Sequence, residues 1–245
     1  MSMANANPPR LMESGNCGDR QEASWQLEST IPARAQIYDG LRQRIIRGEI
    51  PPGTALSEAD IAARFSISRQ PVREAFLKLN EEGLVEVRPQ RGTFVRKINK
   101  NDVMDARFVR EAIETKIVRE LAVAPDAGLI RQLRQLLAAQ EAIPLQHLND
   151  FMKLDEEFHR TLASAAGRLY GWKVVEGIKA QMDRVRYITL HSLPQKKLIR
   201  QHAAITDAIE KAQPDKAEIE MQQHLMLVIE DLSSIEKESP DFFVS

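Results

Sequence analysis

The sequence predicts a mainly α-helical protein with one small β-hairpin, and three observations support this fold class. Apolar residues recur at helical spacing through most of the chain, and beyond Lys100 no alternating pattern typical of a strand appears. Proline and glycine residues interrupt the helical patterns at short intervals, which favours compact antiparallel helices. Aromatic residues make up only 5% of the chain, as in helical proteins, while an apolar share of 43% suffices for two cores.

Length and charge indicate two domains, because 245 residues exceed the usual size of one. Residues 31–100 carry thirteen Lys and Arg against eight Asp and Glu, whereas the residues from Asn101 onward carry nineteen against twenty-three. A basic domain followed by an acidic one fits one domain for nucleic acid and one for another ligand. We expect a disordered tail over 1–30, a first domain over 31–98, a second over 101–237 and a tail over 238–245.

Composition excludes several classes of protein. Cys17 is the only cysteine, so neither a disulfide framework nor a cysteine-based zinc finger can form within one chain. Residues 1–30 lack the apolar run of a signal peptide, and no apolar run approaches the length of a membrane span. We therefore expect a cytoplasmic protein without a membrane partner.

The first domain is predicted to begin with a helix over 35–50, which the sequence Pro51-Pro52-Gly53 ends. Two shorter helices follow, separated by a polar turn, with Ser57 and Ser68 as their expected N-caps. Each pattern has one apolar face that is expected to be buried. The expected core positions are Ile37, Leu41, Ile45, Ile46, Ile61, Ala62, Phe65, Val72, Ala75, Phe76 and Leu79.

The other face of the last of these helices is polar and basic near its N-terminus, where Ser68, Arg69, Gln70 and Arg73 lie. In a helix-turn-helix the residues at this end reach base edges in the major groove. Arg pairs there with guanine and Gln with adenine. The four residues are therefore candidate DNA contacts.

A hairpin is predicted after Gly83, the expected C-cap of the same helix. Residues 84–87 and 93–95 are short β-type runs, and residues 88–92 turn between them. At the tip, Arg91 can hold phosphate or enter the minor groove, and Gly92 supplies freedom in φ. Two helices followed by such a wing form a winged helix-turn-helix. The alternative is a solvated charged helix beside an unrelated hairpin.

The second domain is predicted to be an all-helical antiparallel bundle. Its helices are expected over 101–123, 127–142, 145–165, 169–192, 195–211 and 215–236. Their breaks fall at Pro125, Pro144, Gly167, Pro194 and Pro214. Such a bundle can enclose a cavity lined by the polar side chains that point inward.

Histidines supply candidate metal ligands in the second domain. Asp155 and His159 lie four residues apart, so they share one helix face and can chelate one ion. His202 and His224 lie on two later helices. If those helices adjoin, one carboxylate and three imidazoles suit Zn²⁺, and also Ni²⁺ or Mn²⁺. The alternative is that these are ordinary surface or core residues.

Arginines are the candidate effector-binding residues. Arg110 precedes Glu114 by four residues on the first helix of the bundle, and Arg184 lies near Arg186 on a later one. In a cavity the planar guanidinium of an arginine takes a ligand carboxylate through two hydrogen bonds. Surface ion pairs are the alternative.

The block LSEADIAARFSISRQPVREAFLKLNEEGLVEVRPQRGTFV resembles the winged helix-turn-helix of GntR-type bacterial transcription regulators. The helical remainder resembles the FCD effector domain of the FadR subfamily, and the resemblance runs from about Ala35 to Ile235. It implies a dimer with two DNA-binding heads on an all-helical, effector-binding core. Arg69 and Arg73 match the recognition-helix arginines of the family, and Gly92 matches the wing-tip glycine.

The resemblance also implies a metal site, because metal-binding FCD domains use an Asp-x-x-x-His pair followed by two later histidines. Asp155, His159, His202 and His224 fall on those positions. The fatty-acyl-CoA-responsive founder of the subfamily has an arginine where this chain has Ala59, and it lacks these histidines. A CoA thioester is therefore not the expected ligand. The strings SRQPVREAF and RPQRG resemble regulators of sugar-acid catabolism in enteric bacteria.

The function expected first is a ligand-responsive, DNA-binding transcription regulator that represses a catabolic operon. Its expected partners are double-stranded operator DNA, a small carboxylate or sugar-acid effector, and a second copy of the chain, with Val118 and Leu121 at the interface. A divalent transition metal, Zn²⁺ before Ni²⁺ or Mn²⁺, is the expected cofactor. Two alternatives stay open: a metal-dependent enzyme fused to a DNA-binding head, and a purely structural metal.

Overall fold

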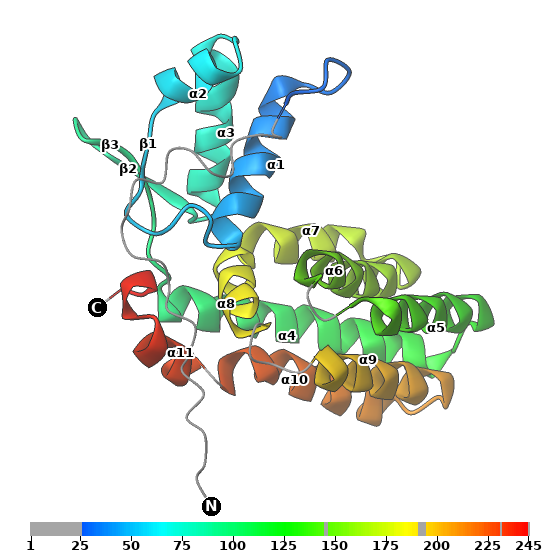
Figure 1. Cartoon of the computed structure of the whole chain (residues 1–245). Coiled ribbons are helices and arrows are strands. Elements are labelled where there is room, and N and C mark those ends of the chain that lie inside the picture. Colours follow the sequence, from blue (N-terminus) through cyan, green and yellow to red (C-terminus); the bar gives the residue numbers. More distant parts are fainter. Residues whose placement is uncertain (1–25, 145–146, 191–194, 231, 245) are drawn as a thin grey trace, which may run out of the picture.

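The structure is a computed structural model that describes residues 26–144, 147–190, 195–230 and 232–244. Most of the predicted N-terminal tail, including Cys17, therefore lies outside the described residues. The described chain forms two domains, one above the other in Figure 1, with the N-terminal domain in blue and cyan. It is mainly helical with one small sheet, so the predicted fold class is confirmed.

The N-terminal domain has a three-stranded antiparallel sheet in the order β1-β3-β2 beside three helices. Its elements are α1 (Ala33–Ile46), β1 (Ala55–Leu56), α2 (Glu58–Arg64), α3 (Arg69–Glu81), β2 (Val85–Arg88) and β3 (Gly92–Val95). The sequence predicted only the hairpin of β2 and β3. The third strand was missed because two residues, Ala55 and Leu56, are too few to show an alternating pattern.

The structure confirms one of the two predicted N-caps of this domain, and of the predicted core positions Ile61 and Phe65 are only partly buried. Ser57 caps α2, because its Oγ accepts a hydrogen bond from the Asp60 N–H at 3.2 Å. Ser68 occupies the N-cap position of α3, but its side chain accepts no hydrogen bond there, so its predicted capping role is wrong. The predicted buried face of α3 is confirmed, since Val72, Ala75, Phe76 and Leu79 are all buried.

The C-terminal domain is a bundle of antiparallel helices with a short C-terminal addition. Its helices are α4 (Lys100–Val123), α5 (Ala127–Ala142), α6 (Leu148–Ala165), α7 (Leu169–Ile178), α8 (Ala180–Leu190), α9 (Gln195–Glu210), α10 (Pro214–Glu230), α11 (Leu232–Glu238) and the 3-10 helix η1 (Pro240–Phe242). The helix predicted over 169–192 is two helices, α7 and α8, which meet at Lys179. The ammonium group of this buried residue binds Asp183 Oδ2 at 2.7 Å and Glu156 Oε2 at 3.4 Å.

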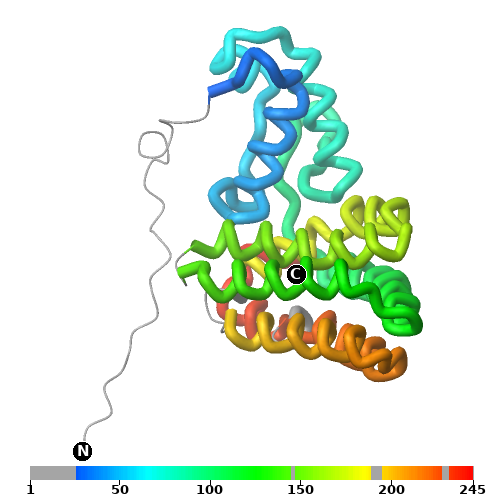
Figure 2. Tube along the Cα trace, turned by 90° about the vertical axis from the view of Figure 1, so that its right-hand side faces the viewer, coloured from blue at the N-terminus to red at the C-terminus, as the bar shows by residue number. Residues whose placement is uncertain are grey.

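The bundle encloses its own core, and α9 and α10 lie on the side away from the N-terminal domain (Figure 2). Val118 is fully buried in this core, and Leu121 is partly buried against it. Both residues were expected at a dimer interface. That expectation is wrong for Val118, whose side chain is fully buried in the bundle, and it stays a prediction for Leu121. In the described residues no helix is both long enough and apolar enough to cross a membrane.

Helix α8 joins the two domains and lies below α1 in Figure 1. Three of its side chains contact the N-terminal domain or the linker between the domains, residues 96–99. Gln181 donates a hydrogen bond to the carbonyl of Gly83, and Arg184 Nη1 donates one to the carbonyl of Arg96 at 2.7 Å. Asp183 Oδ2 lies 3.4 Å from Arg42 Nη2 of α1.

The C-terminal residues also hold the linker between the domains. The N–H of Ile98 donates to the carbonyl of Phe242 at 2.7 Å, and the N–H of Val244 donates to the carbonyl of Ile98 at 3.0 Å. Phe243 is buried in a cluster that includes Ile98 and Val103. Residues 238–245 were expected to be a tail, but those that the structure describes pack against the linker, because two consecutive phenylalanines supply the apolar surface to bury.

Candidate metal centre and nucleic-acid interface

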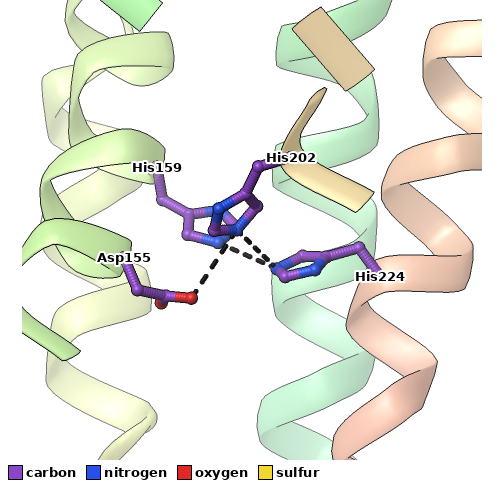
Figure 3. A group of neighbouring side chains, drawn as sticks. All are labelled: Asp155, His159, His202 and His224. Atoms are coloured by element: carbon purple, nitrogen blue, oxygen red, sulfur yellow. Dashed lines mark hydrogen bonds and ion pairs between the residues drawn. The ribbon is translucent and has the colours of Figure 1, made fainter. Parts of the chain in front are cut away.

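Three helices of the bundle bring the four predicted metal ligands together. Asp155 and His159 come from α6, His202 from α9 and His224 from α10 (Figure 3). Each residue offers one ligand atom, and these atoms all lie within 4.8 Å of one another. The four side chains are between 0% and 3% exposed. A buried group of this kind needs a compensating partner, because desolvation of polar groups is costly.

The imidazoles point their Nε2 atoms at a common centre. His159 Nε2 lies 3.1 Å from His224 Nε2, and His202 Nε2 lies 3.4 Å from the same atom. The nearest oxygen of Asp155 is 3.6 Å from His202 Nε2. Neither carboxylate oxygen of Asp155 accepts a well-oriented hydrogen bond from a described residue. The centre thus collects nitrogen and oxygen lone pairs, as a metal site does.

Acceptors outside the cluster hold the other ring nitrogens. His159 Nδ1 lies 2.5 Å from Glu114 Oε2, and His202 Nδ1 lies 3.0 Å from Gln140 Oε1. His224 Nδ1 lies 3.3 Å from Gln201 Oε1. These oxygens favour a proton on each Nδ1, which leaves each Nε2 with a free lone pair. Such outer acceptors fix tautomer and ring orientation in metal-binding histidines.

The orientation of Gln140 is itself determined. Its Nε2 donates a hydrogen bond to the carbonyl of Leu154 at 3.1 Å, so its oxygen is the atom that faces His202. Gln140 is fully buried, and it comes from α5, a fourth helix. Nothing in the sequence indicated Gln140, Gln201 or the role of Glu114 toward His159, because contacts between different helices leave no spacing signal in the chain.

The electrostatics keep the cluster in a metal-binding protonation state. Burial lowers the pKa of His202 to about 3, and it lowers the pKa of His224 well below its usual range. Burial opposes ionisation of Asp155, but Arg186 and the neighbouring histidines hold the pKa of its carboxyl well below the ordinary value. Near neutral pH the two imidazoles are therefore neutral and the carboxylate is charged, as metal ligands must be.

The two predicted effector arginines lie in different surroundings. Arg110 is buried, and its Nε donates to Glu114 Oε1 at 2.6 Å, which links it to His159 through the same carboxylate. Burial opposes ionisation of Glu114, yet Arg110 and His159 lower the pKa of Glu114 to about 2. Arg110 therefore borders the cluster.

Arg184 instead points at the domain junction, where it bonds the carbonyl of Arg96 and the Gln181 side chain. The arginine of α8 that reaches the cluster is Arg186, whose Nη2 lies 2.6 Å from Asp155 Oδ1. Residues two apart on a helix point about 200° from one another, so only one of the two can face the bundle interior. The choice of Arg184 is corrected to Arg186.

The predicted DNA contacts are all exposed, at two places in the N-terminal domain. Ser68, Arg69, Gln70 and Arg73 are exposed at the start of α3, and Arg91 and Gly92 are exposed at the turn between β2 and β3. At the start of α3, Arg73 lies 3.4 Å from Glu58 Oε2, and Gln70 donates to Glu74 Oε1 at 3.0 Å. At the turn Gly92 has φ +104°, a value that favours glycine.

Family models match both domains. Residues 33–95 match the family "Bacterial regulatory proteins, gntR family", and residues 105–226 match the FCD domain. The HTH-type transcriptional repressor RspR of Escherichia coli K12 is 43% identical over 220 residues, which cover 89% of this chain and 96% of that protein. The chain belongs to the GntR family. This GntR protein is a DNA-binding transcription regulator, and the enzyme alternative is not favoured.

Other relatives and solved structures resemble this GntR regulator. The gluconate operon transcriptional repressor of Bacillus subtilis is 31% identical over 162 residues, which cover 66% of this chain and 65% of that one. The structure of Escherichia coli McbR/YncC has a TM-score of 0.67 at 15% identity, covering 85% of this chain and 99% of that chain. A Rhodococcus sp. RHA1 GntR protein has a TM-score of 0.65 at 24% identity, covering 83% and 97%. These two likenesses show the shared fold.

Proposed function

We propose that this GntR regulator is a metal-dependent repressor of the FadR subfamily that responds to a small carboxylate or sugar acid and binds its operator as a homodimer. The observation that carries the proposal is the buried cluster of Asp155, His159, His202 and His224, with each Nδ1 held from outside. A buried cluster of this kind, in the domain that follows the DNA-binding domain, suits a protein that senses a small ligand.

The DNA-binding part of the proposal rests on exposure and charge. Arg69, Gln70 and Arg73 stand at the exposed N-terminal end of α3, where a recognition helix meets base edges. Arg91 at the wing tip suits a phosphate or the adjacent minor groove. We assign base reading to the α3 residues, with Ser68, Arg91 and Gly92 positioning the protein on the backbone.

The metal-binding part rests on the donor set. One carboxylate and three imidazoles suit Zn²⁺, with Ni²⁺ and Mn²⁺ as further candidates. An ion bound there supplies a positive centre to which a ligand carboxylate can bind. Arg110 and Arg186 border the cluster and are suited to neutralise a second acidic group of the effector. We leave Arg184 out of the effector site.

A surface cavity on the outside of the bundle shares one residue, Gln201, with the surroundings of the cluster. It has a volume of about 470 Å³ between α4, α9 and α10, and is lined by Arg107, Glu111, Lys197, Gln201, Gln222, Gln223 and Met226. Gln201 belongs to both places, because its side chain lines the cavity and its Oε1 contacts His224 Nδ1. Cationic and amide groups in one cavity suit an oxygen-rich anion such as a sugar acid. A gluconate operon repressor among the relatives supports this class of effector.

The dimer part rests on two apolar stripes on neighbouring helices. Met104 and Phe108 are exposed on α4, and Tyr170, Val174 and Ile178 are exposed on α7, with Phe108 at 73% and Tyr170 at 81%. Helices α4 and α7 pack against each other. Large apolar side chains on a surface mark an interaction site. We propose a second copy as the partner, because paired heads read the paired half-sites of an operator.

The decisive experiment measures metal content, operator binding and ligand response on one set of variants. We expect about one transition metal per chain in the wild type. His202→Ala and His224→Ala should lose the metal and the response to sugar acids while they retain specific DNA binding. His147→Ala, which changes an exposed histidine, is the matched control.

Two outcomes contradict parts of this proposal. A wild-type protein that takes up no metal from Zn²⁺, Ni²⁺ or Mn²⁺ solutions would remove the metal site. A ligand response that survives removal of the metal would make the ion structural, and the effector would then depend on Arg110 and Arg186 alone.

A further inference from the structure

Arg186 of α8 lies near both the metal-ligand cluster and the ion pair of Asp183 with Arg42, which links the two domains. Its Nη2 lies 2.6 Å from Asp155 Oδ1, and both side chains are buried. Burial opposes charging of Arg186, but the carboxylates of Asp155 and Asp183 together raise the pKa of Arg186 above that of a free arginine. Asp183 precedes Arg186 by three residues on α8, so these two buried side chains are neighbours on the helix. Arg186 therefore lies next to two buried acids, one in the cluster and one at the domain junction.

Asp183 is the acid at the junction. Its Oδ2 binds Lys179 Nζ at 2.7 Å and lies 3.4 Å from Arg42 Nη2 of the DNA-binding domain. Its Oδ1 is buried and accepts no hydrogen bond from a described residue. One carboxylate oxygen of Asp183 thus contacts the DNA-binding domain, and the other can accept a hydrogen bond from a further donor.

Arg42 fixes this contact to the head. Its Nε binds Glu82 Oε2 at 2.8 Å, and Glu82 also accepts a hydrogen bond from Tyr38. Arg42, Glu82 and Tyr38 belong to the DNA-binding domain, so the pair of Arg42 with Asp183 is a direct ionic link between the two domains. The link is largely buried, so the loss of either partner leaves an uncompensated buried charge, which is costly.

We propose that Arg186 is a coupling residue, shared between Asp155 and Asp183, through which the state of the metal centre sets the strength of the link from Arg42 to the DNA-binding domain. The proposal rests on the metal centre described above. When Asp155 is engaged by a cation, Arg186 is freed toward Asp183 and competes there with Arg42. The reverse also holds by linkage: a stronger link of Asp183 to Arg42 leaves Arg186 with Asp155 and opposes cation binding.

The test uses Zn²⁺ affinity of the full chain, measured by competition with a chromophoric chelator. Arg42→Gln lies in the other domain, yet it should tighten Zn²⁺ binding about fivefold or more, because Asp183 then draws Arg186 from Asp155. Asp183→Asn should weaken Zn²⁺ binding by a similar factor, because Arg186 then stays with Asp155. The matched control is Arg34→Gln, which removes an exposed α1 arginine paired with Glu74 and should change nothing.

A further variant separates coupling through Arg186 from a general effect of charge. In an Arg186→Gln background, Arg42→Gln and Asp183→Asn should each leave Zn²⁺ affinity within about twofold, because non-coupled sites are additive. Equal effects with and without Arg186 would overturn the proposal, as would changes of the same sign in the two single variants.

Amide hydrogen exchange tests the role of Arg186 even if the protein binds no metal. Asp155→Asn imitates the loss of that carboxylate and should free Arg186 toward Asp183. Amide hydrogen exchange of the α1 segment around Arg42 should then rise about fivefold in Asp155→Asn, and not in Asp155→Asn with Arg186→Gln. An unchanged exchange rate would refute the role of Arg186, whereas absent metal uptake alone would refute only the metal centre.

Discussion

Gln140 Oε1 lies 3.0 Å from Nδ1 of His202, and this contact decides which ring nitrogen of His202 faces Asp155. The oxygen cannot be exchanged for the amide nitrogen, because that nitrogen is already bonded to the carbonyl of Leu154. One buried amide on α5 thus prepares a ligand that belongs to α9.

We expect Gln140→Leu to lower metal affinity about 10- to 100-fold, the usual cost of losing such an outer partner. The substitution keeps the volume but removes the acceptor that holds the Nδ1 proton. Competition with a chromophoric chelator measures the change. Gln135→Leu, on the exposed face of the same helix, is the control, and equal affinities for the two variants would contradict the assignment.

The exposed start of α3 predicts two kinds of DNA-binding defect. Arg69→Ala and Arg73→Ala should each weaken operator binding by about 1–3 kcal/mol and relax sequence preference, if they read bases. Arg91→Ala should weaken binding to all sequences alike and lower the slope of affinity against salt by about 1. Gel shifts over a salt series distinguish these. Full operator affinity in Arg69→Ala would remove α3 as the recognition helix.

Tyr38 predicts a loss of stability in alkali. Burial and its hydrogen bond to Glu82 raise the pKa of Tyr38 above the ordinary value of 10. Above that value the unfolded chain releases the phenol proton while the folded protein keeps it, so stability falls by about 1.4 kcal/mol per pH unit. Below the ordinary value this contribution is complete.

Urea denaturation between pH 9 and pH 11 measures this effect against two variants. Tyr38→Phe should show a shallower decline than the wild type, and Tyr170→Phe should follow the wild type because Tyr170 is exposed. A Tyr38→Phe curve parallel to that of the wild type would show that the phenol ionises alike in both states.

The stripe on α4 and α7 predicts how the protein assembles. Phe108→Glu should convert a dimer into a monomer at micromolar concentration, because it places a charge in an apolar contact. Sedimentation velocity measures the change. Leu77→Glu replaces an exposed apolar side chain of the DNA-binding domain and should leave the dimer intact. A wild type that sediments as a monomer would exclude this interface.

Much of the N-terminal domain could be predicted because its signals are local. The cap at Ser57 and the buried face of α3 each depend on neighbours within one or two turns. The error at Ser68 has a local cause as well: a suitable residue at the N-cap position does not ensure that its side chain makes the bond. Strand β1 has only two residues, so its pairing depends on β3 and not on its own sequence.

The candidate metal centre could be predicted only in part. The four ligands could be predicted from their spacing and from the family resemblance. Gln140 and Gln201 could not, because they contact His202 and His224 from different helices. Arg184 was expected at the cluster, but Arg186 is the residue that contacts Asp155. The sequence did not show that a new helix, α8, begins after Lys179, and two residues along a helix turn a side chain to nearly the opposite face. Val118 was misplaced for a different reason: cores and interfaces use the same apolar residues, so the sequence does not distinguish them.

The pairing of Ile98 with Phe242 and Val244 has a consequence for biosynthesis. The helices and strands of the winged domain all end by Val95 and contact near neighbours, so they can form while the ribosome is still translating the helical bundle, and Ala180 of α8 joins their core only later. The hydrogen bonds that Ile98 of the linker makes with Phe242 and Val244, in contrast, can form only after more than a hundred further residues have left the ribosome. A nascent chain therefore carries a folded DNA-binding domain whose orientation is not yet fixed. That orientation is fixed last, when the C-terminal residues bind the linker.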